Sequence, residues 1–146
     1  RKKAPLLMTT SPVWLITLAF FAALSPIHSG TVQFEVHHPA ASNADIRIAL
    51  YDSKTTWLEE PAHTAIAAAT DTLTIVRFAD VPAGIFGAAV YLDKNRNGKL
   101  DRNLVGWFKE PFGFSREARV RLGPPKWDDA IFEVNDEEIV LEVTLD

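Results

Sequence analysis

Residues 31–37, Thr-Val-Gln-Phe-Glu-Val-His, alternate polar and apolar side chains at every step. Successive side chains of a β-strand point to opposite faces, so this pattern predicts a strand with one buried face. Six further segments repeat it, and turn-forming sequences separate them. They are residues 46–51, 73–78, 89–92, 118–122, 130–134 and 139–145. Seven short strands within about 110 residues are typical of an all-β fold, and we expect a seven-stranded antiparallel sandwich of two sheets.

Two segments interrupt the alternation. Residues 57–70 are rich in alanine, and we expect a helical turn followed by an irregular edge strand. Residues 103–117 combine aromatic side chains with glycine and proline, which predicts a long ordered loop.

The N-terminal segment has the pattern of a secretory signal. Three basic residues, Arg1, Lys2 and Lys3, precede an uncharged stretch whose apolar part covers residues 13–24. A transmembrane helix needs about 20 apolar residues, whereas a signal needs roughly 7–15. We expect a signal peptide at residues 1–29, cleavage after Ser29, and one domain at 30–146. The mature protein is then periplasmic or secreted without a stable membrane anchor; an uncleaved anchor is the alternative.

Charge and cysteine content restrict the classes of partner. The chain carries a formal charge of −4, and loss of the three N-terminal basic residues brings the mature domain to −7. An acidic domain repels phosphate, so neither nucleic acid nor an anionic membrane is an expected partner. The chain has no cysteine, so its stability must come from the core, from turns or from a bound ion.

Residues 93–101, Asp-Lys-Asn-Arg-Asn-Gly-Lys-Leu-Asp, have the spacing of an EF-hand-type calcium loop. Side-chain oxygens stand at positions 1, 3, 5 and 9, glycine stands at position 6, and position 7 offers its backbone carbonyl. Hard oxygen ligands favour calcium over zinc or copper. The predicted metal ligands are Asp93, Asn95, Asn97, Lys99, Asp101 and, as a ligand from outside the loop, Glu110.

The same loop has features that disfavour a strong site. Position 12 is Leu104, where an EF-hand places a bidentate glutamate. Four basic residues also stand against two loop carboxylates. They are Lys94, Arg96, Lys99 and Arg102. The alternative is a hairpin turn whose Asn and Asp side chains bind their own backbone.

No catalytic set stands out. His37 and His38 are adjacent in a strand, so their rings should point to opposite faces, and His63 stands alone. The leading hypothesis is a non-enzymatic binding or accessory domain. The rival is a small periplasmic hydrolase that uses the carboxylates of Glu110 and of Asp128 or Asp129.

An aromatic cluster follows the candidate calcium loop. It consists of Trp107-Phe108 and Phe112-Gly113-Phe114. Exposed rings would stack on a glycan or hold a protein partner, whereas buried rings would pin the long loop to the sheets. The ligand therefore remains an unknown protein or glycan.

Several blocks together resemble the DUF2141 family of bacterial exported proteins. They are residues 78–90, the loop 93–101, residues 106–115 and residues 123–130. The resemblance covers nearly all of the mature chain. It implies a periplasmic or secreted β-sandwich of transthyretin-like or immunoglobulin-like type, and it implies no particular activity.

Overall fold

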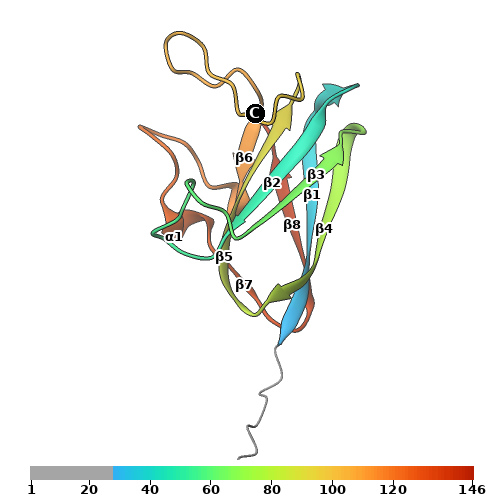
Figure 1. Cartoon of the computed structure of the whole chain (residues 1–146), viewed down its shortest axis with the longest axis vertical. Helices are drawn as coiled ribbons and strands as arrows, with labels where there is room; N and C mark the ends of the chain where they lie inside the picture. Colours follow the sequence, from blue (N-terminus) through green and yellow to red (C-terminus); the bar gives the residue numbers. More distant parts are fainter. Residues whose placement is uncertain (1–27) are drawn as a thin grey trace, which may run out of the picture.

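The computed structural model describes residues 28–146 as two β-sheets with very little helix (Figure 1). The predicted signal segment, apart from its last two residues, lies outside the described part. The strands are β1 (Ser29–Ala41), β2 (Asp45–Tyr51), β3 (His63–Ala68), β4 (Asp71–Pro82), β5 (Gly84–Asp93), β6 (Phe112–Phe114), β7 (Phe132–Val134) and β8 (Glu138–Thr144). A 3-10 turn, η1 (Ser115–Glu117), follows β6, and one short helix, α1 (Trp127–Ala130), precedes β7. From residue 28 onward, no helix is long and apolar enough to cross a membrane.

The first sheet has the strand order β4-β1-β8 and is built on the segment whose alternation is clearest. Val32, Phe34 and Val36 of β1 are fully buried, as the period-two pattern predicts. β1 pairs with β4 in antiparallel and with β8 in parallel orientation. The expectation of a wholly antiparallel fold is therefore wrong for the β1–β8 pair. No short hairpin joins these two strands, so the turn rule that forces antiparallel neighbours does not apply to them.

The second sheet has the order β3-β2-β5-β6, and β7 pairs with the start of β5. β3 is the edge strand expected after residue 57, but the expectation that it would be irregular is wrong, because it pairs with β2 in unbroken register over its six residues. Its inward side chains include Ala65 and Ala67, which pack against the core. Small alanines in place of large β-branched residues weaken the sequence signal for a strand.

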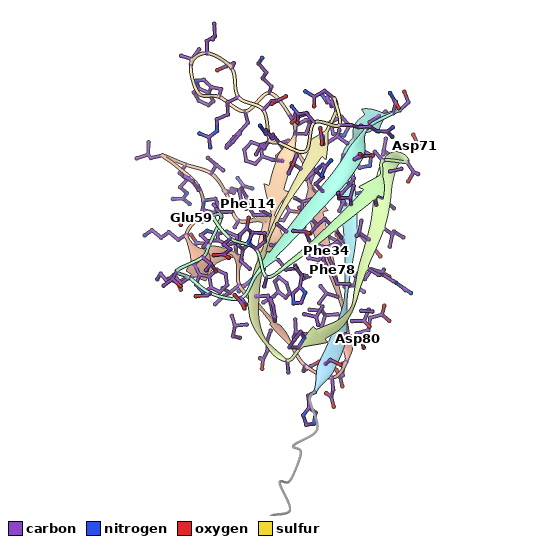
Figure 2. All side chains as sticks on the ribbon, viewed as in Figure 1. Phe34, Glu59, Asp71, Phe78, Asp80 and Phe114 are labelled. Atoms are coloured by element: carbon purple, nitrogen blue, oxygen red, sulfur yellow. The ribbon has the colours of Figure 1, made fainter. Side chains whose placement is uncertain are left out.

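The two sheets share one core. Phe34 lies between them and meets the rings of Phe78 and Phe132 edge-on, at centroid distances of 5.9 and 6.3 Å (Figure 2). The buried apolar cluster draws on strands of both sheets, including Ile48 of β2 and Val90 of β5. A two-sheet all-β architecture is thus confirmed, with eight strands instead of seven in the described residues.

One predicted strand, residues 118–122, is absent. Arg116 and Glu117 adopt positive φ angles of 57° and 51°, which turn the chain away from the sheet after β6. Pro124 and Pro125 follow and lack backbone donors. The alternating Arg and apolar residues of 118–122 therefore belong to an exposed loop.

The short strand β6 brings the loop region against the end of the chain. Phe112 and Asp146 exchange backbone hydrogen bonds of 3.2 and 3.3 Å. Gly113 lies so close to β8 that a Cβ atom there would stand 2.7 Å from the carbonyl oxygen of Thr144. Glycine at this position therefore lets β6 lie close to the end of β8.

Candidate functional site

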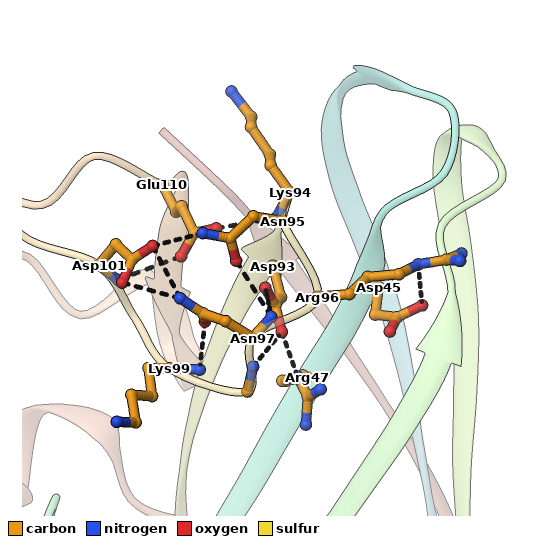
Figure 3. Close-up of polar contacts among 11 residues, drawn as sticks. Asp45, Arg47, Asp93, Lys94, Asn95, Arg96, Asn97, Lys99, Asp101 and Glu110 are labelled. Atoms are coloured by element: carbon orange, nitrogen blue, oxygen red, sulfur yellow. Dashed lines mark hydrogen bonds and ion pairs between the residues drawn. The ribbon is translucent and has the colours of Figure 1, made fainter.

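The loop that follows β5 is anchored by its first carboxylate. Asp93 is fully buried, and its Oδ2 accepts hydrogen bonds from Arg47 Nε at 2.6 Å and from the Gly98 amide at 2.8 Å (Figure 3). Its Oδ1 accepts from the Asn97 amide at 3.1 Å. Arg47 comes from β2, the neighbouring strand, where it stands directly opposite Tyr91. One carboxylate therefore closes the loop and ties it to the sheet.

These contacts determine the charge state of Asp93. Burial opposes ionisation, but the hydrogen bonds from Gly98, Arg47 and Asn97 and the charge of Arg47 outweigh it. The pKa of Asp93 is held below its ordinary value of 3.8. The side chain is therefore a carboxylate at neutral pH, as a cation ligand or an ion-pair partner must be.

The second anchor is Glu110, which is 6% exposed. Its Oε1 accepts from the Lys94 amide at 2.8 Å and its Oε2 from the Asp101 amide at 3.1 Å. The residue that sequence reasoning offered as an outside ligand therefore lies at the loop. There it joins the loop's first and last turns through the backbone.

Three side chains of the loop converge on the solvent side. Asp101 accepts from Asn95 Nδ2 at 2.6 Å and from Asn97 Nδ2 at 3.0 Å. The oxygens of the two Asn side chains accept the amides of Asn97 and Lys99, as in Asx turns. Positions 3, 5 and 9 of the motif therefore meet, with the Asn nitrogens directed at Asp101 and the Asn oxygens at backbone amides.

The cluster contains oxygen atoms of the kind that calcium prefers as ligands. To present its oxygen beside Asp101, each Asn amide must rotate by a half turn and give up its hydrogen bond to Asp101 and the one that it accepts from the backbone, so a cation between the oxygens would have to replace these bonds. Among residues 28–146, however, no three carboxylate or imidazole side chains are close enough to hold an ion together. A cation here would rely on Asn oxygens and the Lys99 carbonyl beside Asp101, with Asp93 and Glu110 engaged mainly by the backbone.

The four basic residues that disfavour calcium binding by the loop direct their charged groups away from the Asp101 cluster or pair with other side chains. Arg96 Nε lies 3.2 Å from Asp45 Oδ1, and Arg102 lies over the ring of Phe108, 4.4 Å from its centroid. The side chains of Lys94 and Lys99 point away from the cluster (Figure 3). The local repulsion is therefore weaker than the sequence suggested.

A groove of about 570 Å³ lies beside this loop, on the outer face of the second sheet. Its lining joins segments that are far apart in the sequence. The aromatic members are Tyr51, Trp57, Tyr91, Phe108, Phe112 and Phe114. Sequence reasoning missed the first three. Tyr51 and Tyr91 occupy outward positions of β2 and β5, and the period-two pattern could have placed them on a common face.

Aromatic contacts fix the floor of the groove. The ring of Trp57 packs edge-on against the rings of Tyr51 and Trp127, at centroid distances of 5.1 and 5.5 Å. Its Nε1 donates a hydrogen bond to the Pro125 carbonyl at 2.9 Å. At the other end of the groove, the ring centroids of Phe108 and Phe112 lie 4.5 Å apart, and both side chains are half-buried. The groove is preformed, because these rings hold each other in place.

The aromatic cluster predicted after the calcium loop therefore divides into three environments. Phe114 is buried, Phe108 and Phe112 are half-buried in the groove, and Trp107 is 73% exposed. The cluster is therefore buried at Phe114 and exposed at Trp107.

The carboxylates proposed for a hydrolase do not form one group. Glu110 is buried and holds two amides, whereas Asp128 is exposed and pairs with Lys54 at 3.0 Å. Asp129 lines a separate cavity of about 670 Å³ formed by the loop before α1.

The two adjacent histidines face opposite sides of β1, as expected. His37 is exposed, whereas His38 is buried and forms a 2.9 Å hydrogen bond between its Nε2 and Thr74 Oγ1.

The comparisons with known proteins yield one match. A family model described as "Uncharacterized protein conserved in bacteria (DUF2141)" matches residues 34–142. No curated protein and no solved structure matches the chain.

Proposed function

Because this chain belongs to the DUF2141 family, whose model spans both sheets and the loops between them, we propose that it is an exported, non-enzymatic binding domain. Its ligand is a glycan held in the aromatic groove, and calcium in the 93–101 loop stiffens one wall of that groove. The sandwich is of the transthyretin-like or immunoglobulin-like type that the family resemblance implies.

The observation that carries this proposal is the preformed groove with half-buried rings. Sugar rings present flat C–H faces and a hydroxyl rim, and aromatic faces with nearby polar groups suit both parts. Phe108, Phe112 and Tyr91 supply ring surface, while Arg102 and Glu59 line the same groove and supply charged hydrogen-bonding groups. A pocket of this size lies within the roughly 300–1,000 Å³ range of small-molecule sites.

The calcium part of the proposal rests on the position of the loop. Asp101 is followed by Arg102, and Arg102 forms an isolated bridge with Phe108 in the groove wall. Ordering Asp101 by a cation would therefore restrict the loop segment that carries Phe108. Rigid walls lose less entropy on binding, so calcium should strengthen ligand affinity.

The export part rests on the N-terminal sequence pattern. N-terminal sequencing of protein recovered from outside the cytoplasm should give a start at or within a few residues of Gly30. Recovery of a membrane-bound form that retains residues 13–24 would contradict it.

The hydrolase alternative has less support. Both oxygens of Glu110 accept backbone hydrogen bonds, and Asp128 and Asp129 lie exposed on α1. Glu110 is buried and both of its oxygens are engaged by the loop backbone, so they are not free to act on a substrate together with an aspartate of α1.

The decisive experiment compares two neighbouring aromatic residues. Glycan-array screening of the protein is followed by calorimetry on the glycans that bind. Phe108→Ala should weaken binding at least tenfold, because it removes a ring of the groove wall. Trp107→Ala is the matched control and should bind normally, because Trp107 does not line the groove. Absence of glycan binding, or equal losses in the two variants, would overturn the proposal.

A further inference from the structure

The charge of the mature domain is strongly segregated. Nine of the twelve Lys and Arg residues in 30–146 lie between residues 94 and 126, where only three acidic residues occur. That segment carries a formal charge of +6, and the remainder of the domain carries −13. The overall charge of −7 therefore conceals a basic region. At physiological ionic strength the Debye length is about 8 Å, so a surface facing the basic loops responds mainly to them.

The first of these loops ends in an exposed apolar tip. In the hairpin formed by residues 102–108, Leu104, Val105 and Trp107 are 108%, 80% and 73% exposed. Exposed apolar side chains that gather on one part of a surface are the feature that marks an interaction site.

Several hydrogen bonds define the shape of the exposed hairpin. Arg102 and Phe108 form an antiparallel bridge across its base. Asn103 closes the turn: its amide donates to the Trp107 carbonyl at 2.8 Å, and its Oδ1 accepts from the Val105 and Trp107 amides at 3.0 Å. The apolar side chains are thus held outward by the backbone, and the turn cannot easily fold them back.

A second basic loop has the same composition. Leu122 is 107% exposed and is preceded by Arg119 and Arg121. Both loops border the aromatic groove, the hairpin through Phe108 and the second loop through Val120. They extend beyond the sheets as the two orange projections of Figure 1. The apolar tips therefore flank one side of the molecule.

From this arrangement we propose that the protein binds anionic phospholipid surfaces through the tips of the two loops, an activity beyond the glycan binding proposed above. The tips are convex and separate, whereas a stable protein interface needs a continuous complementary surface of roughly 1,200–2,000 Å². A bilayer accepts isolated protrusions, because each apolar side chain enters the interfacial layer by itself. Indole rings favour that layer, and flanking basic residues attract anionic headgroups.

The test uses co-sedimentation of the exported chain, from which the proposed signal segment has been removed, with lipid vesicles. Every variant carries the same N-terminus, so differences between variants arise from the loops. The protein should bind vesicles containing phosphatidylglycerol at least tenfold more tightly than vesicles of phosphatidylcholine alone. Raising the salt from about 0.05 to about 0.5 M should remove most of that preference, because it shortens the Debye length.

Substitutions then locate the contact. The double variant L104S/W107S should lose at least tenfold in affinity for the anionic vesicles, and R119Q/R121Q should lose much of the preference for anionic lipid. I66S is the matched control: Ile66 is 60% exposed on the edge strand β3, away from both loops, and its replacement should change nothing.

The outcomes that overturn the proposal are distinct. No binding to anionic vesicles, equal binding to neutral vesicles, or an equal loss in I66S would each refute it and would leave a protein partner as the explanation of the tips. Phe108→Ala tests the glycan proposal separately, because it should weaken glycan binding at least tenfold and leave vesicle binding unchanged.

Discussion

Replacing Asp93 by Asn is the perturbation whose cost the structure allows us to work out most directly. The substitution preserves shape and removes the charge. It breaks the 2.6 Å ion pair with Arg47. Because an Asn side chain has one oxygen, it also leaves either the Asn97 amide or the Gly98 amide without its acceptor. Asp93 is fully buried, while the Arg47 side chain retains 22% exposure.

The magnitude follows from that burial. Removing one partner of a buried ion pair typically costs about 3–5 kcal/mol, and the partial exposure of Arg47 places this pair at the lower end. We therefore expect the free energy of unfolding to fall by about 3 kcal/mol. At a few degrees per kcal/mol for a domain of this size, the melting temperature should fall by roughly 10 °C.

The assay is thermal and urea unfolding in EGTA and in millimolar calcium, with Asp101→Asn as the matched control. Asp101 accepts side-chain hydrogen bonds only from exposed Asn95 and Asn97, so its replacement should leave the stability in EGTA nearly unchanged. In the wild type, a hundredfold excess of calcium over its dissociation constant should add about 2.7 kcal/mol. Both variants should lose most of that gain, because each removes a carboxylate from a loop with only two.

Acidification provides an independent check. Because the pKa of Asp93 is lowered in the folded state, its stabilisation is complete above the ordinary value of 3.8. It is lost as the pH falls through the lower folded-state value. The stability difference between wild type and Asp93→Asn should therefore be constant at neutral pH and shrink below about pH 4.

Two results would refute this reasoning. If Asp93→Asn were within about 0.5 kcal/mol of the wild type in EGTA, the range of ordinary surface substitutions, the carboxylate would not anchor the loop. If calcium left the melting temperature of the ion-stripped wild type unchanged, the loop would be the Asx-stabilised turn that the sequence also allows.

Three further substitutions test the frame around the site by urea unfolding. Glu110→Gln should cost about 1–3 kcal/mol, because one of its two loop amides loses its acceptor; a neutral result would mean that water replaces it. Gly113→Ala should cost about 1–3 kcal/mol, because its methyl group would stand 2.7 Å from a β8 carbonyl oxygen. Gly123→Ala is the control and should leave the stability unchanged, because the space around Gly123 is open. Equal effects of the two substitutions would contradict the close approach of Gly113 to β8. Ser115→Ala should cost about 1–3 kcal/mol, because the fully buried hydroxyl accepts the Ala88 amide at 2.9 Å; an unchanged midpoint would contradict that bond.

The sequence by itself determined the strands that carry large alternating side chains. In β1, β2 and β5 the apolar residues stand at every second position, and burial of one face follows from the pleat alone. The Asp/Asn/Gly spacing of 93–101 also determined a tight loop with inward oxygens, since that geometry is local. The sequence also contains the uneven distribution of charge between residues 94–126 and the rest of the domain, but the net charge alone does not report it.

Tertiary structure decided whatever depends on contacts between distant segments. The alternation of 118–122 is as good as that of a strand, yet the positive φ angles of Arg116 and Glu117 direct it away from any partner. The parallel course of β8 beside β1 has no local signal, because only packing selects the direction of strands that no hairpin joins. The groove likewise needs Trp57 to meet the outer face of the second sheet, and the ionised state of Asp93 needs Arg47, which stands 46 positions away. Periodicity reports which face of a segment is buried, but it cannot report which other segment covers that face.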